Sequence, residues 1–155
     1  MTRAPFLAVL LAGCVSCQET TVEPLRLCAT PGPTVGADRA VTAAAGAWHG
    51  LVELSCVQPH TRLYWSARRR DGEGLAVAER IGGASMVTVY ADAVGSGLLV
   101  GLLTHELGHV LGLCHRGGGI MAATMAGPAV LGVDEWLEAE RMRAAGVVGP
   151  RKACE

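Results

Sequence analysis

The chain has 155 residues, of which 50% are hydrophobic and 17% are charged, and its formal net charge at pH 7 is −1. This length has room for one domain, and the composition is that of a globular protein rather than a disordered one. A charge this close to zero provides no electrostatic basis for binding nucleic acid. Aromatic residues are scarce and glycines number 21, so the core has to be built mainly from Leu, Val and Ala.

The start of the chain has the features of an export signal. Residues 5–12 form an apolar run that is too short to span a bilayer, which needs about 20 apolar residues. Leu11-Ala12-Gly13-Cys14 resembles the lipobox of bacterial lipoproteins, in which the chain is cut before the cysteine and the cysteine is acylated. We therefore expect residues 1–13 to be a signal peptide and Cys14 to be the lipidation site. The alternative is an ordinary signal peptide that ends near a cysteine.

A lipoprotein signal predicts an exported protein of the bacterial cell envelope, held at the outer membrane or cell surface by its lipid anchor. Residues 14–24 would then be a tether. Outside the cytoplasm, paired thiols persist as disulfides, and five cysteines remain once the lipobox cysteine is acylated. The sequence leaves their connectivity open. The pairing that we favour joins Cys28 to Cys56 and Cys114 to Cys154, with Cys17 free in the tether.

Residues 25–155 are expected to fold as the one domain, which begins with a strand, a helix and two strands. The predicted bounds are Leu25–Ala29, Asp38–His49, Leu51–Val57 and Thr61–Arg69. Asp38 is a good helix cap, and apolar residues alternate with polar ones along 61–69, which predicts a strand with one buried face.

Two further strands, a central helix and a last helix follow. The predicted bounds are Leu75–Ile81, Ser85–Ala91, Leu98–Leu111 and Asp134–Ala145. The central helix, with Ser96 as its expected cap, is apolar over a wide arc and should be buried. In the last helix, Trp136, Leu137 and Met142 are expected to face inward.

The central helix also has the residues of a metal site. His105 and His109 are one turn apart on one face, so both imidazoles can reach one ion about 2.0–2.1 Å away. Glu106 stands where a carboxylate can take a proton from an activated water without binding the metal. Gly112 can adopt the positive φ that ends the helix and returns His115 to the same ion. Three nitrogen ligands leave a fourth position open, which is typical of catalytic zinc.

Two other interpretations of these residues are a helix surface that carries histidines and a purely structural metal site. Closed structural zinc sites usually have four protein ligands and often thiolates, and Cys114 is the nearby thiol. The spacing of the five fixed positions favours the catalytic zinc ion.

The sequence His105-Glu106-x-x-His109-x-x-Gly112-x-x-His115 resembles the zinc motif of the metzincin metalloproteases, and most closely that of the matrixins. Gly119-Ile120-Met121 is similar to their Met-turn, in which Met121 would form an apolar floor below the histidines. Met125 is a competing candidate for this floor.

The resemblance implies an α+β fold in which a small, mixed, twisted sheet packs on an N-terminal helix and a central active-site helix, followed by the Met-turn and a C-terminal helix. It also implies a zinc endopeptidase with His105, His109 and His115 as ligands and Glu106 as general base. Its protein or peptide substrate would lie in extended conformation along an edge strand, here Leu75–Ile81 or its flank.

The same resemblance makes Ala122–Pro128 a wall of the pocket for the residue after the cleaved bond, and its small side chains predict a roomy, apolar pocket. Only four aspartates are present, so the structural calcium sites of matrixins are not expected. We expect a monomeric, lipid-anchored zinc endopeptidase. The alternative is a non-catalytic, protease-like lipoprotein that binds peptides or a partner and retains the zinc site.

Overall fold

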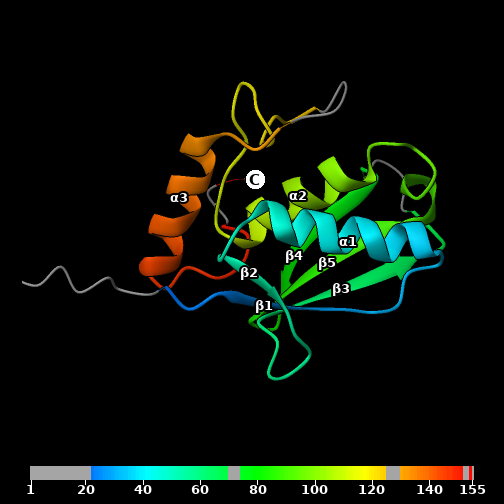
Figure 1. Ribbon diagram of the computed structural model, residues 1–155, viewed down its shortest axis with the longest axis horizontal. Coiled ribbons are helices and arrows are strands. Elements are labelled where there is room, and N and C mark those ends of the chain that lie inside the picture. The colour runs from blue at the N-terminus through cyan, green and yellow to red at the C-terminus, as the bar shows by residue number, and fades with distance from the viewer. Residues whose placement is uncertain (1–21, 70–73, 125–129, 152–153, 155) are drawn as a thin grey trace, which may run out of the picture.

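The computed structural model describes residues 22–69, 74–124, 130–151 and 154 (Figure 1). The predicted signal peptide, Cys14, Cys17 and Met125 lie outside the described residues, as does most of the tether. Among the described residues, no helix is both long enough and apolar enough to cross a membrane.

A five-stranded mixed sheet forms one layer of the fold. Its strands are β1 (Leu25–Ala29), β2 (Val52–Leu54), β3 (Thr61–Ser66), β4 (Ala76–Ile81) and β5 (Ala84–Tyr90). The spatial order is β2-β1-β3-β5-β4, and β4 runs antiparallel to β5 while the other described pairs are parallel. Gly82 and Gly83 connect β4 to β5 with φ values of 57° and 89°, which suit a two-residue hairpin turn. The predicted strand at 75–81 is therefore an edge strand, with β5 as its one neighbour among the described strands.

Three helices complete the fold, namely α1 (Val35–Ala47), α2 (Leu99–Val110) and α3 (Val133–Ala144), with a 3-10 turn, η1 (Ala91–Ala93), before α2. Helices α1 and α2 lie side by side over one face of the sheet, and α3 stands at one side (Figure 1). Trp48, at the end of α1, is fully buried, and its Nε1 donates to Thr104 O of α2 at 3.0 Å. The mixed α/β arrangement confirms the predicted fold class.

The caps of α1 and α2 differ from the prediction. Helix α1 begins at Val35 because Thr34 Oγ1 accepts from Ala37 N at 3.1 Å, whereas Asp38 accepts from Gly32 N at 2.7 Å. Ser96 does not cap α2. Its hydroxyl donates to Ala93 O and accepts from the backbone of the N-cap residue, closing the turn before the helix.

Helix α3 begins at Val133 rather than Asp134, and its inward face is more polar than predicted. Its buried side chains are Glu135, Ala139 and Arg143. Leu137 is 40% exposed, so its predicted burial is wrong. Glu135 faces inward because the helix packs against the turn at Ile120 and Met121, whose backbone N–H groups need a hydrogen-bond acceptor.

Strands β2 and β3 are shorter than predicted. The chain leaves β2 after Leu54 and turns, with a positive φ of 46° at Gln58, and then pairs in parallel with the other side of β1 as β3. Strand β3 ends at Ser66, whose hydroxyl accepts from Arg68 N at 3.3 Å in a local turn that competes with sheet pairing.

Two disulfides confirm the favoured cysteine pairing. Cys28–Cys56 and Cys114–Cys154 have Cα–Cα distances of 4.5 and 4.8 Å, which are within the usual range. The first joins β1 to the segment after β2. The second joins the C-terminal segment to the loop after α2, one residue before His115.

Candidate metal centre

Three imidazoles converge at the end of α2. His105 and His109 are on successive turns, Gly112 ends the helix region with φ 92°, and the chain returns with His115. Their Nε2 atoms are 3.1 Å apart for His105–His109, 3.1 Å for His109–His115 and 3.3 Å for His105–His115. Nitrogens bound tetrahedrally to zinc at about 2.0–2.1 Å lie about 3.3–3.4 Å from one another. The predicted ligands therefore form a group with the size of one face of a zinc site.

The Nδ1 atoms of His105 and His109 determine the tautomer of each neutral imidazole. His105 Nδ1 is 2.7 Å from Ile120 O, and His109 Nδ1 is 2.9 Å from Leu113 O. A carbonyl oxygen only accepts, so each Nδ1 carries the proton and donates it. Each Nε2 then presents a lone pair, and such lone pairs facing one another repel unless a cation lies between them. The donor set fits zinc.

Burial keeps these imidazoles in the neutral form that binds metals. It lowers the pKa of His105, against the hydrogen bond to Ile120 that raises it, and nearby His115 lowers it further. Burial also lowers the pKa of His109 to about 4, where the hydrogen bond to Leu113 raises it and the other two histidines lower it. Protons therefore compete weakly for these two ligands near neutral pH.

Glu106 is buried beside the histidines but is not a member of the three-histidine group. Among protein groups alone, burial raises the pKa of Glu106 to about 7, and a backbone hydrogen bond from Ala78 of β4 lowers it. A carboxyl group with a pKa near neutrality is well matched to general base work. A metal cation nearby would favour the carboxylate form.

Met121 lies against the histidine-bearing turn of α2. Its side chain is fully buried, and a Cβ on Gly108 would overlap Met121 Sδ and come 3.3 Å from Trp48 Cζ2. Glycine at position 108 therefore allows the thioether to approach the backbone of α2 between the two histidines.

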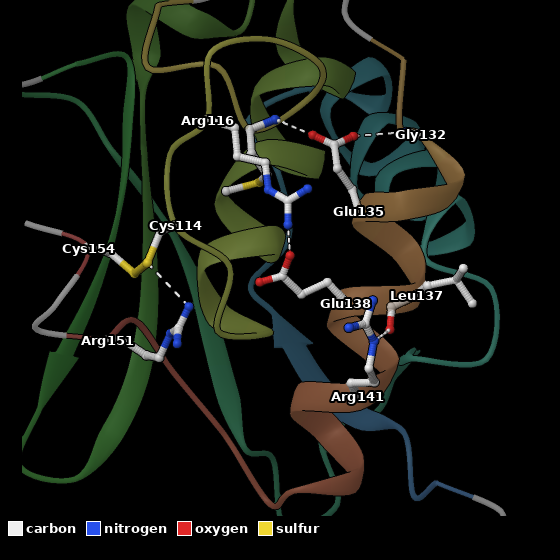
Figure 2. Close-up of polar contacts among 10 residues, drawn as sticks. Cys114, Arg116, Gly132, Glu135, Leu137, Glu138, Arg141, Arg151 and Cys154 are labelled. Atoms are coloured by element: carbon white, nitrogen blue, oxygen red, sulfur yellow. Dashed lines mark hydrogen bonds and ion pairs between the residues drawn. A yellow bond between two sulfur atoms is a disulfide. The ribbon is translucent and has the colours of Figure 1, made fainter.

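Glu135 is a residue of this region that the sequence analysis missed. Its Oε2 accepts from Gly132 N at 2.8 Å (Figure 2) and from Ile120 N at 3.4 Å. Its Oε1 accepts from Met121 N at 3.0 Å. Ile120 also supplies the carbonyl that orients His105. The available signal was an acidic residue three positions after Gly132, in the first turn of α3.

A second link joins α3 to the loop that carries the third histidine. Arg116 forms an ion pair with Glu138 (Figure 2), and its backbone N donates to Met121 O at 2.8 Å. The loop is thus attached both to the helix and to the turn below the histidines.

A cleft of about 460 Å³ opens onto the three histidines and Glu106. Strand β4 and the residues just before it form one wall, and the start of the segment after Met121 forms another. The lining residues outside the metal group are Gly74, Leu75, Ala76, Val77, Ala78, Leu98, Leu102, Ala122, Ala123, Pro150, Arg151 and Cys154. The edge strand therefore borders the candidate site, where an extended peptide could pair with it.

No family model and no curated protein matches the sequence. Among solved structures, the chain is similar to archaemetzincin from Methanopyrus kandleri, with a TM-score of 0.55 and 15% sequence identity. The match covers 81% of this chain and 98% of the archaemetzincin chain. At this identity the similarity shows the fold alone. The protein thus combines an archaemetzincin-like metalloprotease fold with a three-histidine group that could hold zinc.

Proposed function

We propose that the chain is a lipid-anchored, extracytoplasmic zinc endopeptidase of the metzincin type. The observation that carries this proposal is the convergence of three Nε2 atoms in an open cleft, beside a buried carboxyl group that does not join them. A fourth ligand position that stays open is typical of catalytic zinc sites. The fold of a zinc metallopeptidase supports the same conclusion.

The residues of the cleft have separate roles in peptide hydrolysis. His105, His109 and His115 would hold a zinc ion, which supplies Lewis-acid activation of water and of the scissile carbonyl group. The outer edge of β4, beyond the Ala78 N–H that binds Glu106, would hold the substrate backbone in extended form. Glu106 would accept the proton of the attacking water and return it to the leaving amine.

The subtype and the location are supported by the sequence. The motif at residues 105–115 and the buried Met121 support a matrixin-like site. The lipobox-like residues 11–14 support acylation at Cys14, and the two disulfides support an oxidising compartment. In a bacterial host, Cys14→Ala is expected to move the protein from the membrane fraction to the soluble fraction. An unchanged distribution would contradict the anchor.

The catalytic proposal is tested on the purified chain without residues 1–17, with zinc content and cleavage of a quenched peptide as the two measurements. The parent is expected to hold one zinc ion per chain and to lose activity with a chelator. Glu106→Ala should retain zinc while its kcat/KM falls by about 10²- to 10⁴-fold, because it lacks the general base. Glu140→Ala, on α3, is the matched control and should cleave as the parent does.

The possible results separate the two candidate functions. If Glu106→Ala cleaves as fast as the parent, the proposed mechanism is wrong. If the zinc-loaded parent binds peptides but cleaves none, the chain is instead the non-catalytic peptide-binding protein.

A further inference from the structure

The two ends of the cleft are chemically different. Leu98 and Leu102 line it at the N-terminal half of α2, while His105, Glu106 and His109 occupy the C-terminal half, and His115 follows in the next loop. Beyond them, Gly149 N donates to Val110 O at 2.7 Å, which places the C-terminal segment at the far end of the helix. One end of the cleft is therefore apolar, and the candidate metal centre separates it from the C-terminal segment.

Arg151 provides the charge at this far end. It lines the cleft, and its Nη2 donates to Cys114 Sγ at 3.3 Å (Figure 2). Its backbone oxygen accepts from Cys154 N at 2.9 Å, and the Cys114–Cys154 disulfide fastens this segment to the loop that carries His115. The disulfide thus restrains the backbone that carries Arg151 relative to the histidines, and the hydrogen bond to Cys114 Sγ directs its guanidinium.

The guanidinium of Arg151 has few hydrogen-bond acceptors among the described residues. Its Nε is buried without a hydrogen-bond partner, and a sulfur atom is a weak acceptor. Among the described residues no carboxylate pairs with it, in contrast to Arg116, which is paired with Glu138. A guanidinium has five N–H donors, so the side chain, which lines the cleft, still has donors that a carboxylate could accept from in strong, charge-assisted hydrogen bonds.

We propose that Arg151 is a specificity residue that binds an acidic side chain of the extended peptide substrate. This inference rests on the proposed function and adds to it the class of substrate. Because the metal centre lies between Arg151 and the apolar end, the acidic residue and the residue bound at Leu98 and Leu102 lie on opposite sides of the scissile bond.

The test compares peptides, blocked at both ends, that carry Glu or Gln at each position around one cleavable bond. For the parent chain we expect kcat/KM to be about tenfold higher for Glu at one position, the gain of one hydrogen-bonded ion pair. This Glu-to-Gln ratio should fall when NaCl rises from about 0.05 to 0.5 M, because salt screens the pair. In Arg151→Gln the ratio should fall to about one, and in Arg151→Glu a Lys peptide should replace the Glu peptide as the preferred substrate.

Two controls separate charge at this site from charge in general and from misfolding. Arg62→Gln removes an exposed arginine on β3 that does not line the cleft, and it should retain the Glu-to-Gln ratio of the parent. Arg151→Lys retains the positive charge and should retain part of the ratio. Zinc content, measured for each variant, reports whether the site is intact.

Three results would overturn the proposal while leaving the protease function in place. The first is a Glu-to-Gln ratio of kcat/KM near one at every peptide position for the parent chain. The second is a Glu-to-Gln ratio that stays high in Arg151→Gln. The third is a preference for an acidic residue on the same side of the scissile bond as the preference for an apolar residue. If no peptide is cleaved, the protease function fails, and the same peptides are compared by binding anisotropy. Equal Kd values for the Glu and Gln peptides would then overturn the role of Arg151, whereas a preference lost in Arg151→Gln would support it.

Discussion

Glu135 connects the C-terminal helix to the histidine site through backbone atoms. Its buried carboxyl group accepts hydrogen bonds from Ile120 N and Met121 N, and the Ile120 carbonyl in turn orients His105. Glu135→Ala would leave these N–H groups without an acceptor. We expect unfolding free energy to fall by about 2–4 kcal/mol and zinc affinity to fall about tenfold.

Chemical denaturation and a competitive zinc titration measure the two effects of Glu135→Ala. Glu140→Ala, on the same helix, is the control and should change neither quantity. Zinc affinity equal to that of the parent in Glu135→Ala would show that the turn holds His105 in place without the carboxyl group.

At the residue scale, the predictable parts are those whose chemistry requires a spacing along the chain. His105, His109 and Glu106 lie on one helix, so the 3.6-residue period places them together without knowledge of the fold. The positions of Glu135 and Arg151 depend on how distant segments pack, and no local pattern assigns them. Both were therefore found only from the structure.

Helix α2 is central because it packs against the sheet and α1, while its C-terminal half carries His105 and His109. Gly108 allows Met121 and Trp48 to approach this helix between His105 and His109. Gly108→Ala introduces a methyl group where no space exists, so overpacking should outweigh the gain in helix propensity. We expect a loss of about 1–3 kcal/mol in unfolding free energy, together with weaker zinc binding.

Gly46→Ala is the matched control, because nothing lies within 4 Å of a Cβ at this position of α1. It should stabilise the protein by up to about 1 kcal/mol, through helix propensity alone. Thermal unfolding of the two variants gives the comparison. Equal changes in stability for Gly46→Ala and Gly108→Ala would mean that Met121 can move away from the added methyl group without destabilising the protein.

The predicted bounds agree with the structure within one residue for β1, α2 and α3, and they differ most at the start of α1 and at the ends of β2 and β3. The central helix was predicted within one residue at each end, at Leu99–Val110. The start of α1 was placed too late because Thr34, rather than Asp38, caps the helix. Strand order could not be predicted, since the parallel pairing of β1 with β3 depends on a crossover through α1 and β2.

For the whole molecule, the 15% identity to archaemetzincin shows that this fold tolerates almost complete replacement of its sequence. A small core of Leu, Val and Ala is compatible with such replacement as long as volume and pattern are kept. The two disulfides add covalent links to this core at opposite places. One lies at the β1–β2 edge of the sheet, and the other lies beside the metal centre.

The two disulfides should contribute equally to stability and unequally to function. They close loops of similar length, with sequence separations of 28 and 40, so loss of either should lower the unfolding free energy by about 4 kcal/mol. Only Cys114–Cys154 restrains the segment that carries Arg151. Cys114→Ser/Cys154→Ser should therefore lose most of the Glu-to-Gln preference, measured by cleavage or by peptide binding.

Cys28→Ser/Cys56→Ser is the matched control, because it removes the same kind of bond far from the cleft. At a temperature where both variants remain folded and loaded with zinc, the control should retain the preference of the parent. A similar loss of preference in both would mean that the cleft depends on global stability. If neither variant loses it, the backbone bond from Gly149 N to Val110 O is sufficient to position the C-terminal segment.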